Sequence, residues 1–313
     1  MKILLRLAMN FQQLTTFCTV LAEGSMTAAA EKLFLTQPAV SQQIRNLEDE
    51  LNVEVLVRGS RQAKATPQGQ ILYDYAKRII ALNQQAQVAI QTIGEAIQGT
   101  LRIGTLNSLG LYIISPVVGL FLKHNSKLNI KLNYEDGATL IDQFNNDQLD
   151  VIIIPDAQAE YQLPLENADK KLLMKDEMWL VGTSKDTTIP TEVQLKDLNT
   201  KPIVRLSEKF PSFQSALSSQ LESLQTNLTP VFETTNVGTI KRVIESGLGW
   251  GFLPAHSIRK HVRTGRMSSV PIVDFQYPMN VQFYSKQGSD ADQARVFDVF
   301  YRALLQQIQN KSM

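Results

Sequence analysis

The chain is poor in the residues that build disulfide and metal sites. Its 313 residues include one cysteine, Cys18, and three histidines, all far from that cysteine in sequence. A single cysteine cannot close a disulfide within the chain, and a thiolate metal site needs several clustered ligands. The sequence therefore argues against a disulfide-stapled scaffold and predicts neither a metal nor a cofactor. Cys18 falls on the apolar face of an expected helix, which lacks the cationic neighbours of a reactive thiol, so we expect a core residue.

Long hydrophobic runs are also missing. No stretch approaches the roughly 20 apolar residues that a membrane-spanning helix needs, so we expect no membrane partner and a cytoplasmic protein. Residues 1–8 resemble a fragment of a signal peptide, but their apolar part is short and Met9 follows at once. A start codon assigned too early explains this segment better, which leaves Met1 and Met9 as alternative starts.

An excess of positive charge is absent too. The net charge is +1, whereas a nucleic-acid binder draws much of its affinity from cations that contact phosphate. The distribution of charge matters more than its sum. Between Val55 and Tyr73, three basic residues, Arg58, Arg61 and Lys64, occur without an acidic one. A local positive strip is therefore compatible with a nearly neutral chain.

The pattern that is present changes at about Gly99. Residues 10–98 read as almost entirely helical, whereas short β-branched or apolar runs alternate with helical patterns further on. We therefore expect a helical domain over residues 10–66, a long helix over residues 67–98 and an α/β region over residues 99–313.

Two short helices joined by a tight turn are predicted within the helical domain. Ser25 and Thr36 are good N-caps, and Pro38 stands in the first turn of the third helix, where its missing N–H is no loss. That helix carries apolar residues at spacings of four, three and four, which predicts a buried face. The stripe consists of Val40, Ile44, Leu47 and Leu51.

The opposite face of this third helix is polar and begins without acids. It carries Gln37, Ser41, Gln42 and Arg45, and the first acidic residue is Glu48. Gln and Arg can form paired hydrogen bonds with adenine and guanine, and Ser suits close approach to a base. Because the solvated face of any amphipathic helix is polar, the pattern alone leaves DNA reading and plain solvation as alternatives.

The same region resembles the signature of LysR-type transcriptional regulators. The resemblance is carried by AEGSMTAAAEKL at residues 22–33 and by TQPAVSQQIRNLE at residues 36–48, and it continues through LNV, LVR and TPQG at residues 51–53, 56–58 and 66–69. It extends over nearly the whole chain. It implies a bacterial regulator of transcription with an all-α winged helix-turn-helix, a long linker helix and an α/β two-lobed domain like the type 2 periplasmic binding proteins.

The resemblance also assigns a set of DNA-binding residues. The recognition helix and its surroundings would contribute Thr27, Thr36, Gln37, Pro38, Ser41, Gln42 and Arg45. The wing would contribute Arg58, Arg61, Lys64 and Thr66. The sequence departs from the family at Ser41-Gln42, where the family often has Ser-Arg. Gln favours contacts to adenine over guanine, so the family's half-site sequence does not carry over to this chain.

The long helix carries an apolar seam of its own. Leu72, Tyr75, Ile79, Leu82, Ala86, Ala89, Ile93 and Ala96 alternate spacings of three and four. A helix from Pro67 to Ile97 would extend about 46 Å at roughly 1.5 Å per residue, and its seam would need a partner. We expect a homodimer, and the resemblance implies a homotetramer built as a dimer of dimers. Packing of the helix on its own downstream domain is the alternative. The residues assigned to dimerisation are Leu72, Tyr75, Ile79, Leu82, Ala86 and Ile93.

The remaining chain predicts two similar α/β lobes. Strands are expected at residues 101–105, 128–134, 149–154, 178–182, 202–206, 230–233, 251–253 and 281–285, and helices at 109–124, 139–146, 212–224, 237–246, from 255 and at 291–309. This alternation is typical of a parallel sheet flanked by helices. The resemblance implies lobe I at residues 99–165 and 282–313 and lobe II at 166–281, with two chain crossings that form a hinge.

Four segments that precede helices would line the cleft between these lobes. Their candidate effector-binding residues are Thr105, Asn107, Ser108, Thr139, Ser207, Phe210, Asn236 and Val237. Free N–H groups at helix starts favour anions, so we expect a small anionic metabolite. The alternative is that these Ser, Thr and Asn side chains only cap their helices.

Three classes of function remain open at this stage. The first is a regulator that is not an enzyme and binds double-stranded promoter DNA, a small-molecule effector, itself and RNA polymerase. The second is an enzyme on the two-lobed fold fused to a DNA-binding module, but the chain has no catalytic motif, and its glycine run at residues 247–251 precedes a strand where a dinucleotide loop would follow one. The third is an architectural DNA-binding protein, which would leave the sensor unexplained.

Overall fold

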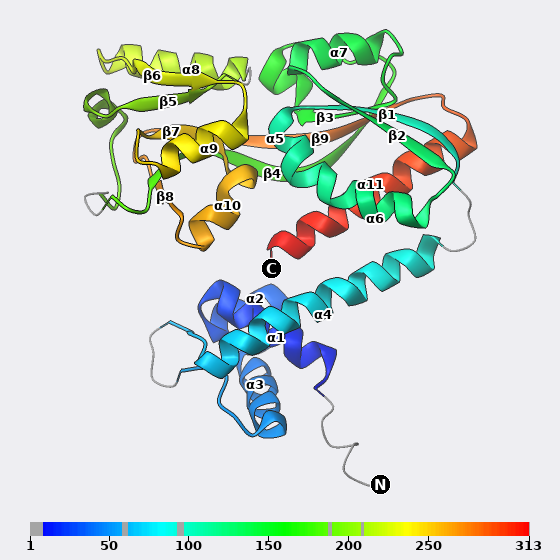
Figure 1. Ribbon diagram of the computed structural model, residues 1–313, viewed down its shortest axis with the longest axis vertical. Coiled ribbons are helices and arrows are strands. Elements are labelled where there is room, and N and C mark those ends of the chain that lie inside the picture. The colour runs from blue at the N-terminus through cyan, green and yellow to red at the C-terminus, as the bar shows by residue number, and fades with distance from the viewer. Residues whose placement is uncertain (1–8, 58–61, 93–96, 187–189, 208–209, 313) are drawn as a thin grey trace. The chain divides into compact units, whose positions relative to one another are not determined.

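The computed structural model describes residues 9–57, 62–92, 97–186, 190–207 and 210–312. The chain divides into two compact units, residues 1–93 with 309–313, and residues 94–308. The first is a helix-turn-helix unit and the second a two-lobed α/β unit, as the sequence predicts (Figure 1).

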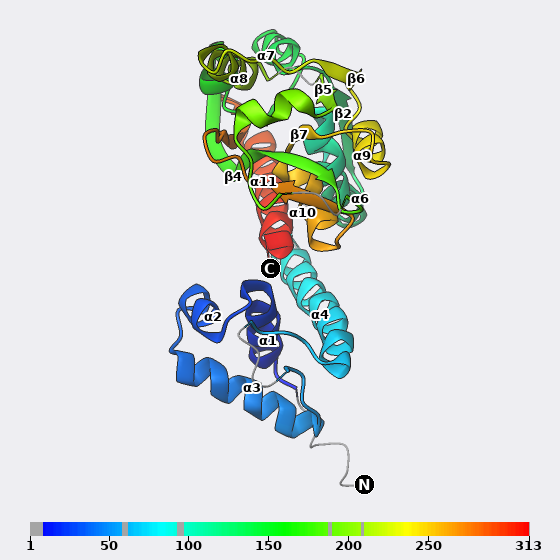
Figure 2. The same ribbon diagram turned by 90° about the vertical axis from the view of Figure 1, so that its left-hand side faces the viewer.

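Three helices form the body of the first unit: α1 (Phe11–Glu23), α2 (Met26–Leu33) and α3 (Gln37–Leu51). Both expected N-caps are confirmed. The Ser25 hydroxyl accepts the N–H groups of Thr27 and Ala28, and the Thr36 hydroxyl accepts that of Ala39. Figure 2 shows α3 lying across one side of α1 and α2.

The core of this unit is apolar and includes the lone thiol. Cys18 is buried, as expected, and burial raises its pKa to about 11, which leaves it protonated and inert at neutral pH. Helix α4 (Pro67–Thr92) adds Ala76 and Ile80 to the same core. Between α3 and α4, an antiparallel bridge pairs Leu56 with Ala65 and closes the base of the wing.

Lobe I of the second unit is built on parallel strands. These are β1 (Gly99–Thr105), β2 (Leu128–Tyr134) and β3 (Val151–Pro155), in the order β2-β1-β3. Helix α7 (Gly137–Asn145) covers one face of their sheet, and α6 (Ser115–His124) and α11 (Ala291–Ser312) lie on the other (Figure 1). Two short elements follow strand ends: α5 (Asn107–Leu109), which continues as the π-helical turn η1 (Gly110–Ile114), and η2 (Ala157–Tyr161).

Lobe II repeats the alternation of strands and helices. Its strands are β5 (Ile203–Leu206), β6 (Pro230–Thr234), β7 (Gly251–Pro254) and β8 (Met267–Val270). Its helices are α8 (Pro211–Ser223), α9 (Val237–Glu245) and α10 (Ala255–Arg263), together with the 3-10 turn η3 (Leu195–Thr200).

Two antiparallel strands connect the lobes. These are β4 (Ala168–Thr183) and β9 (Pro278–Lys286), which run side by side (Figure 1). The first part of β4 pairs with β9, which also pairs with β3 of lobe I, whereas from Met178 onward β4 pairs with β7 and β8 of lobe II. Both strands therefore belong to the two lobes at once.

The glycine run before β7 serves geometry rather than chemistry. Gly247 follows α9 with φ +87°, a conformation that favours glycine. A Cβ atom on Gly249 would lie 2.4 Å from the carbonyl oxygen of Pro202, and one on Gly251 would lie 2.6 Å from that of Val204. The expected roles, a helix end and a close approach of strands, are confirmed.

Two local expectations were wrong. Ile97 does not end the long helix, because its side chain is buried in the core of the second unit and it belongs to no helix. Residues 93–96 lie outside the described residues. The strand expected at residues 178–182 is only the end of β4, since the charged stretch before it also pairs with β9, and β8 had not been expected at all.

In the part of the chain that the structure describes, no helix combines the length and apolarity of a membrane span.

Candidate DNA-binding surface and effector cleft

Helix α3 separates an apolar and a polar face, as its sequence predicts. Val40, Ile44 and Leu47 are buried. The residues assigned to DNA reading lie opposite: Gln37, Pro38, Gln42 and Arg45 are exposed and Ser41 is half-buried. Thr27, at the start of α2, is exposed as well. The structure therefore leaves this polar face free for a ligand.

The Gln42 side chain is oriented by its neighbours on the helix. Its amide nitrogen donates to the Asn46 side-chain oxygen over 2.7 Å, and its amide oxygen accepts from the Arg45 guanidinium over 3.0 Å. Spacings of three and four bring such side chains together on a helix surface. Asn46 was not among the expected site residues, although its position on the same face could have indicated it.

The wing is described only in part. Arg58 and Arg61 lie outside the described residues. Lys64 is exposed, and its carbonyl oxygen accepts the N–H of Val57 over 2.9 Å, which continues the wing's strand pairing. The Thr66 hydroxyl donates to the Glu54 carbonyl and accepts the Gly69 N–H, so it fixes the start of α4 in this structure.

Helix α4 leaves a row of large apolar side chains in solvent. Ile71, Tyr75, Ile79 and Leu82 are 63%, 60%, 40% and 66% exposed, and Ala86 is exposed one turn further. Leu72 differs from the expectation, because it packs on the helix-turn-helix core and Ile71 takes its place in the row. Ile93 lies outside the described residues. An exposed apolar row of this kind marks an interaction surface.

The lobe I residues assigned to the effector are mostly engaged within their own lobe. Thr105 is buried and its hydroxyl donates to the Ile153 carbonyl over 2.7 Å. Thr139 bonds through its N–H and hydroxyl to Asp136, which is the N-cap of α7. Ser108 is buried, and the buried side-chain oxygen of Asn107 has no hydrogen-bond partner. Asn107 is therefore the member of this group with capacity left for a ligand.

The lobe II residues are engaged in the same way. Asn236 caps α9 by accepting the Thr239 N–H over 2.9 Å, and the Ser207 hydroxyl donates to the Glu233 carboxylate over 2.7 Å. Phe210 and Val237 are buried in apolar clusters. These last two shape the lobe from inside rather than offering their side chains to the cleft.

Two contacts that the sequence did not reveal join the lobes. Glu160 of η2 reaches the start of α8, and Lys241 of α9 reaches Tyr112 of η1. Burial raises the pKa of the Glu160 carboxyl above its ordinary value, and burial lowers the pKa of Lys241 to about 8. Neither residue belongs to a recognisable motif, and each meets a partner far away in sequence.

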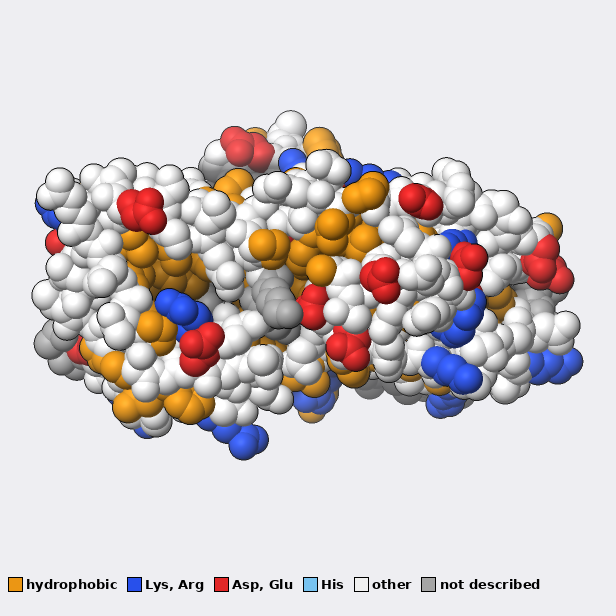
Figure 3. Space-filling model, turned by 90° about the horizontal axis from the view of Figure 1, so that it is seen from above, with side chains coloured by type: hydrophobic (Ala, Val, Ile, Leu, Met, Phe, Trp, Pro, Cys, Tyr) orange, Lys and Arg blue, Asp and Glu red, His pale blue; other side chains and the backbone are white. Residues whose placement is uncertain are grey.

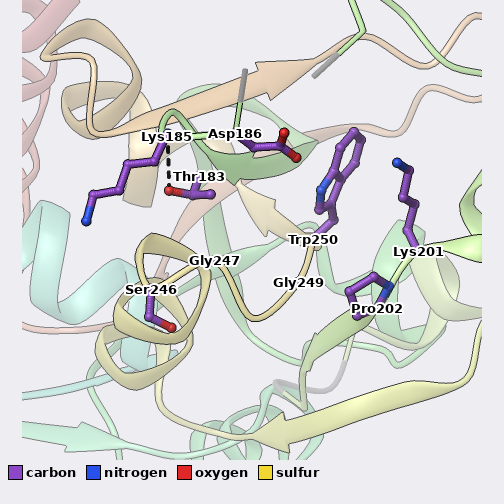
Figure 4. Close-up of a pocket in the computed structure, with 9 residues that line it drawn as sticks. All are labelled: Thr183, Lys185, Asp186, Lys201, Pro202, Ser246, Gly247, Gly249 and Trp250. Atoms are coloured by element: carbon purple, nitrogen blue, oxygen red, sulfur yellow. Dashed lines mark hydrogen bonds between the residues drawn. The ribbon is translucent and has the colours of Figure 1, made fainter. Parts of the chain in front are cut away.

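A separate cavity of about 370 Å³ lies within lobe II (Figure 4). It is lined by Thr183, Lys185, Asp186, Lys201, Pro202, Ser246, Gly247, Gly249 and Trp250. The Lys201 ammonium lies 5.3 Å from the centre of the Trp250 ring system. None of the expected effector residues lines this cavity.

Charges of both signs are mixed on the face shown in Figure 3, and hydrophobic side chains gather near its middle. This face lacks the continuous basic strip that marks nucleic-acid binding. Among the described residues, no group of three or more His, Cys, Asp and Glu side chains could hold a metal ion.

Comparisons with known proteins give a consistent result. Residues 11–70 match the family model "Bacterial regulatory helix-turn-helix protein, lysR family", and residues 94–309 match "LysR substrate binding domain". The nitrogen assimilation regulatory protein nac of Escherichia coli K12 is 30% identical over 256 residues, which is 80% of each chain.

Two solved structures share the fold. Full-length OxyR from Pseudomonas aeruginosa has a TM-score of 0.53 at 19% identity, and the match covers 95% of this chain and 100% of that one. Vibrio fischeri DarR in complex with DNA has a TM-score of 0.52 at 19% identity, with 94% and 99% covered.

Proposed function

The chain belongs to the LysR family of bacterial transcriptional regulators, and from that premise we propose how its described residues read DNA, pair and sense a ligand. It is a DNA-binding regulator with an effector-binding domain. Its α3 enters the major groove and reads bases through Gln37, Ser41, Gln42 and Arg45, while the wing contacts phosphates. The observation that carries this proposal is the polar face of α3, which bears no acid before Glu48 and lies opposite a buried stripe.

Pairing of two chains through α4 completes the DNA-binding device. The exposed row formed by Ile71, Tyr75, Ile79, Leu82 and Ala86 supports this role, because a partner helix would cover it. A dimer presents two recognition helices to two half-sites related by its symmetry. We extend the proposal to a tetramer, a dimer of dimers, that works in the cytoplasm and contacts RNA polymerase at the promoter.

The two-lobed unit senses a small anionic metabolite between its lobes and carries out no reaction of its own. Free N–H groups at the helix starts would favour an anion, and the shared strands β4 and β9 would form a hinge whose equilibrium a ligand biases by preferring one arrangement of the lobes. Asn107, with its unpartnered oxygen, is the residue on lobe I best placed to receive a donor from the ligand.

Genomic footprinting of the full-length protein tests the whole proposal. We expect protected promoters that share a sequence with two-fold symmetry, and neighbouring genes would indicate the pathway and the ligand. A thermal-shift screen against metabolites then separates a sensor from an architectural protein, because a ligand of the folded state raises the melting temperature. Uniform coverage of the genome without preferred promoters would contradict the proposal.

A further inference from the structure

A carboxylate of lobe I is bound by the first turn of a helix in lobe II. One Glu160 carboxylate oxygen accepts the N–H groups of Ser212 and Phe213, over 3.0 and 3.2 Å. The other accepts the hydroxyl of Tyr277 over 2.6 Å. The Ser212 hydroxyl in turn donates to the Glu160 carbonyl over 2.8 Å. Four hydrogen bonds therefore join this single residue to lobe II.

The position that Glu160 fills is the one an anionic ligand would prefer. The first N–H groups of a helix have no partner within it, and the helix dipole favours negative charge there. Helix α8 begins with Pro211, so Ser212 and Phe213 carry its first two N–H groups. With the Tyr277 hydroxyl, three donors converge on the two oxygens of one carboxylate. The contact thus has the donor set of a binding site for a carboxylate ion.

Aromatic rings exclude water from this contact. Phe213 packs against Phe252, Phe275 and Tyr277, with ring centres 5.6, 6.2 and 5.2 Å apart. Glu160 is only 3% exposed. Burial raises the pKa of its carboxyl, while the hydrogen bonds from Tyr277, Phe213 and Ser212 oppose that rise. A carboxylate in such surroundings depends on its donors, since an unpartnered buried charge is strongly unfavourable.

A second contact of opposite polarity joins the same lobes. The Lys241 ammonium of lobe II donates to the Tyr112 hydroxyl of lobe I over 2.9 Å and to the Ser257 carbonyl over 2.8 Å. It also lies 4.1 Å from the centre of the Tyr112 ring. The lobes are therefore connected by an anion from one side and a cation from the other.

We infer that the Glu160 carboxylate occupies the site of an anionic effector. It holds the lobes together until a free anion displaces it from the start of α8. The inference rests on the proposed function, because it names the chemistry and the regulation of the same cleft. A tethered group competes at its effective concentration, which is about millimolar for short connections. The parent protein consequently binds a carboxylate effector more weakly than a variant without this side chain.

Chemical rescue of the full-length protein tests the inference. Glu160→Ala should lower the melting temperature by about 2 to 4 °C, the shift expected for about 1 kcal/mol in a domain of this size. Sodium acetate at 100 mM should restore at least half of the loss, and sodium chloride at equal ionic strength should restore none. Glu166→Ala, which removes an exposed acid at the boundary between the two lobes, is the matched control and should respond to neither salt.

Two outcomes would overturn the inference. One is acetate acting on Glu160→Ala no more than chloride does, and the other is acetate acting alike on the parent and both variants. If Glu160→Ala fails to fold, Glu160→Met replaces it, which keeps the length and removes both acceptor oxygens, and hydrogen exchange at the Ser212 and Phe213 N–H groups should then be at least tenfold faster than in the parent. Exchange at the parental rate would likewise contradict the inferred role of Glu160.

These measurements involve no DNA and no metabolite. Failure to find a promoter or an effector would therefore refute the proposed function while the acetate result still decides the role of Glu160. Should a carboxylate effector emerge from screening, its affinity for Glu160→Ala should exceed that for the parent about tenfold. Weaker binding to the variant would count against displacement.

Discussion

At the scale of single residues, Gln42 is the side chain on α3 whose chemistry most directly predicts a base contact. Its amide is held between Asn46 and Arg45, and both partners are exposed, so a base edge can replace these hydrogen bonds. We expect Gln42→Ala to lower affinity for the operator by about 1 to 3 kcal/mol and to leave binding to random duplex nearly unchanged. Competition mobility shifts with both duplexes measure the difference.

Lys64→Ala is the matched control for that experiment. Lys64 is an exposed cation of the wing, so its loss should weaken binding to both duplexes about equally and reduce the salt dependence. Equal losses on both duplexes for Gln42→Ala would remove it from the set of base-reading residues.

Lys241 gives a prediction about pH. Burial lowers its pKa from its ordinary 10.5 to about 8, although Glu245 opposes the shift, and the residue is 4% exposed. Between those two pH values the unfolded chain binds more protons than the folded one, so the free energy of unfolding rises with pH through that window. Below pH 8 the full cost of burying the charged ammonium is present.

The comparison is with Lys241→Met, which keeps the length and loses the charge. Relative to this variant, the parent's free energy of unfolding should increase between pH 7.5 and pH 10 by up to about 3 kcal/mol. Urea titrations of both proteins at the two pH values give the difference. A difference that does not change with pH would show that folding does not lower the pKa of Lys241.

At the scale of elements, α4 has two apolar stripes with different roles. One, with Ala76 and Ile80, belongs to the helix-turn-helix core, and the other is the exposed row. Leu82→Asp should therefore dissociate the protein to monomers and abolish tight operator binding, because one recognition helix alone remains in a groove. Gln68→Asp, an exposed polar position of the same helix, is the control. Sedimentation velocity decides, and an unchanged oligomer for Leu82→Asp would assign the row to contacts within one chain.

Helices and strands whose apolar side chains follow a simple period could be predicted from the sequence. Elements that depend on partners distant in sequence could not. The caps and the apolar stripe of α3 follow from local chemistry, so Ser25, Thr36 and Val40 could be placed from sequence. The charged first part of β4 has no apolar alternation, and only its pairing with β9 makes it a strand. The placement of Leu72 failed for a related reason, because a heptad count does not say which of two neighbouring stripes meets the domain's own core.

At the scale of the whole molecule, the sequence indicated the helix starts of both lobes but not the contacts that join the lobes. Helix starts are marked by Asn236 and Asp136, which are local signals. Glu160 meets Ser212 across 52 positions and Lys241 meets Tyr112 across 129, and no local pattern announces either pair. Local signals therefore mark the helix starts, whereas the contacts between the lobes depend on tertiary structure.

Effector binding between the lobes should be coupled to DNA binding. Thr139 lies half-buried in the first turn of α7, next to its capping Asp136. Thr139→Phe should fill the cleft there and weaken binding of an effector identified by thermal-shift screening at least tenfold, while operator binding by the ligand-free protein persists. A ligand can shift the hinge only through its differential affinity for the two arrangements, so the variant should also lose the effector's influence on DNA.

Calorimetry with the effector and mobility shifts with the operator are measured on the same preparation. Thr264→Phe, which adds the same ring at an exposed position at the end of α10, controls for the bulk of the substitution and should behave like the parent. Parental effector affinity in Thr139→Phe would place the ligand elsewhere. Loss of operator binding and oligomerisation together with effector binding would instead assign Thr139 a structural role at the start of α7, where its bonds to Asp136 already stabilise the first turn.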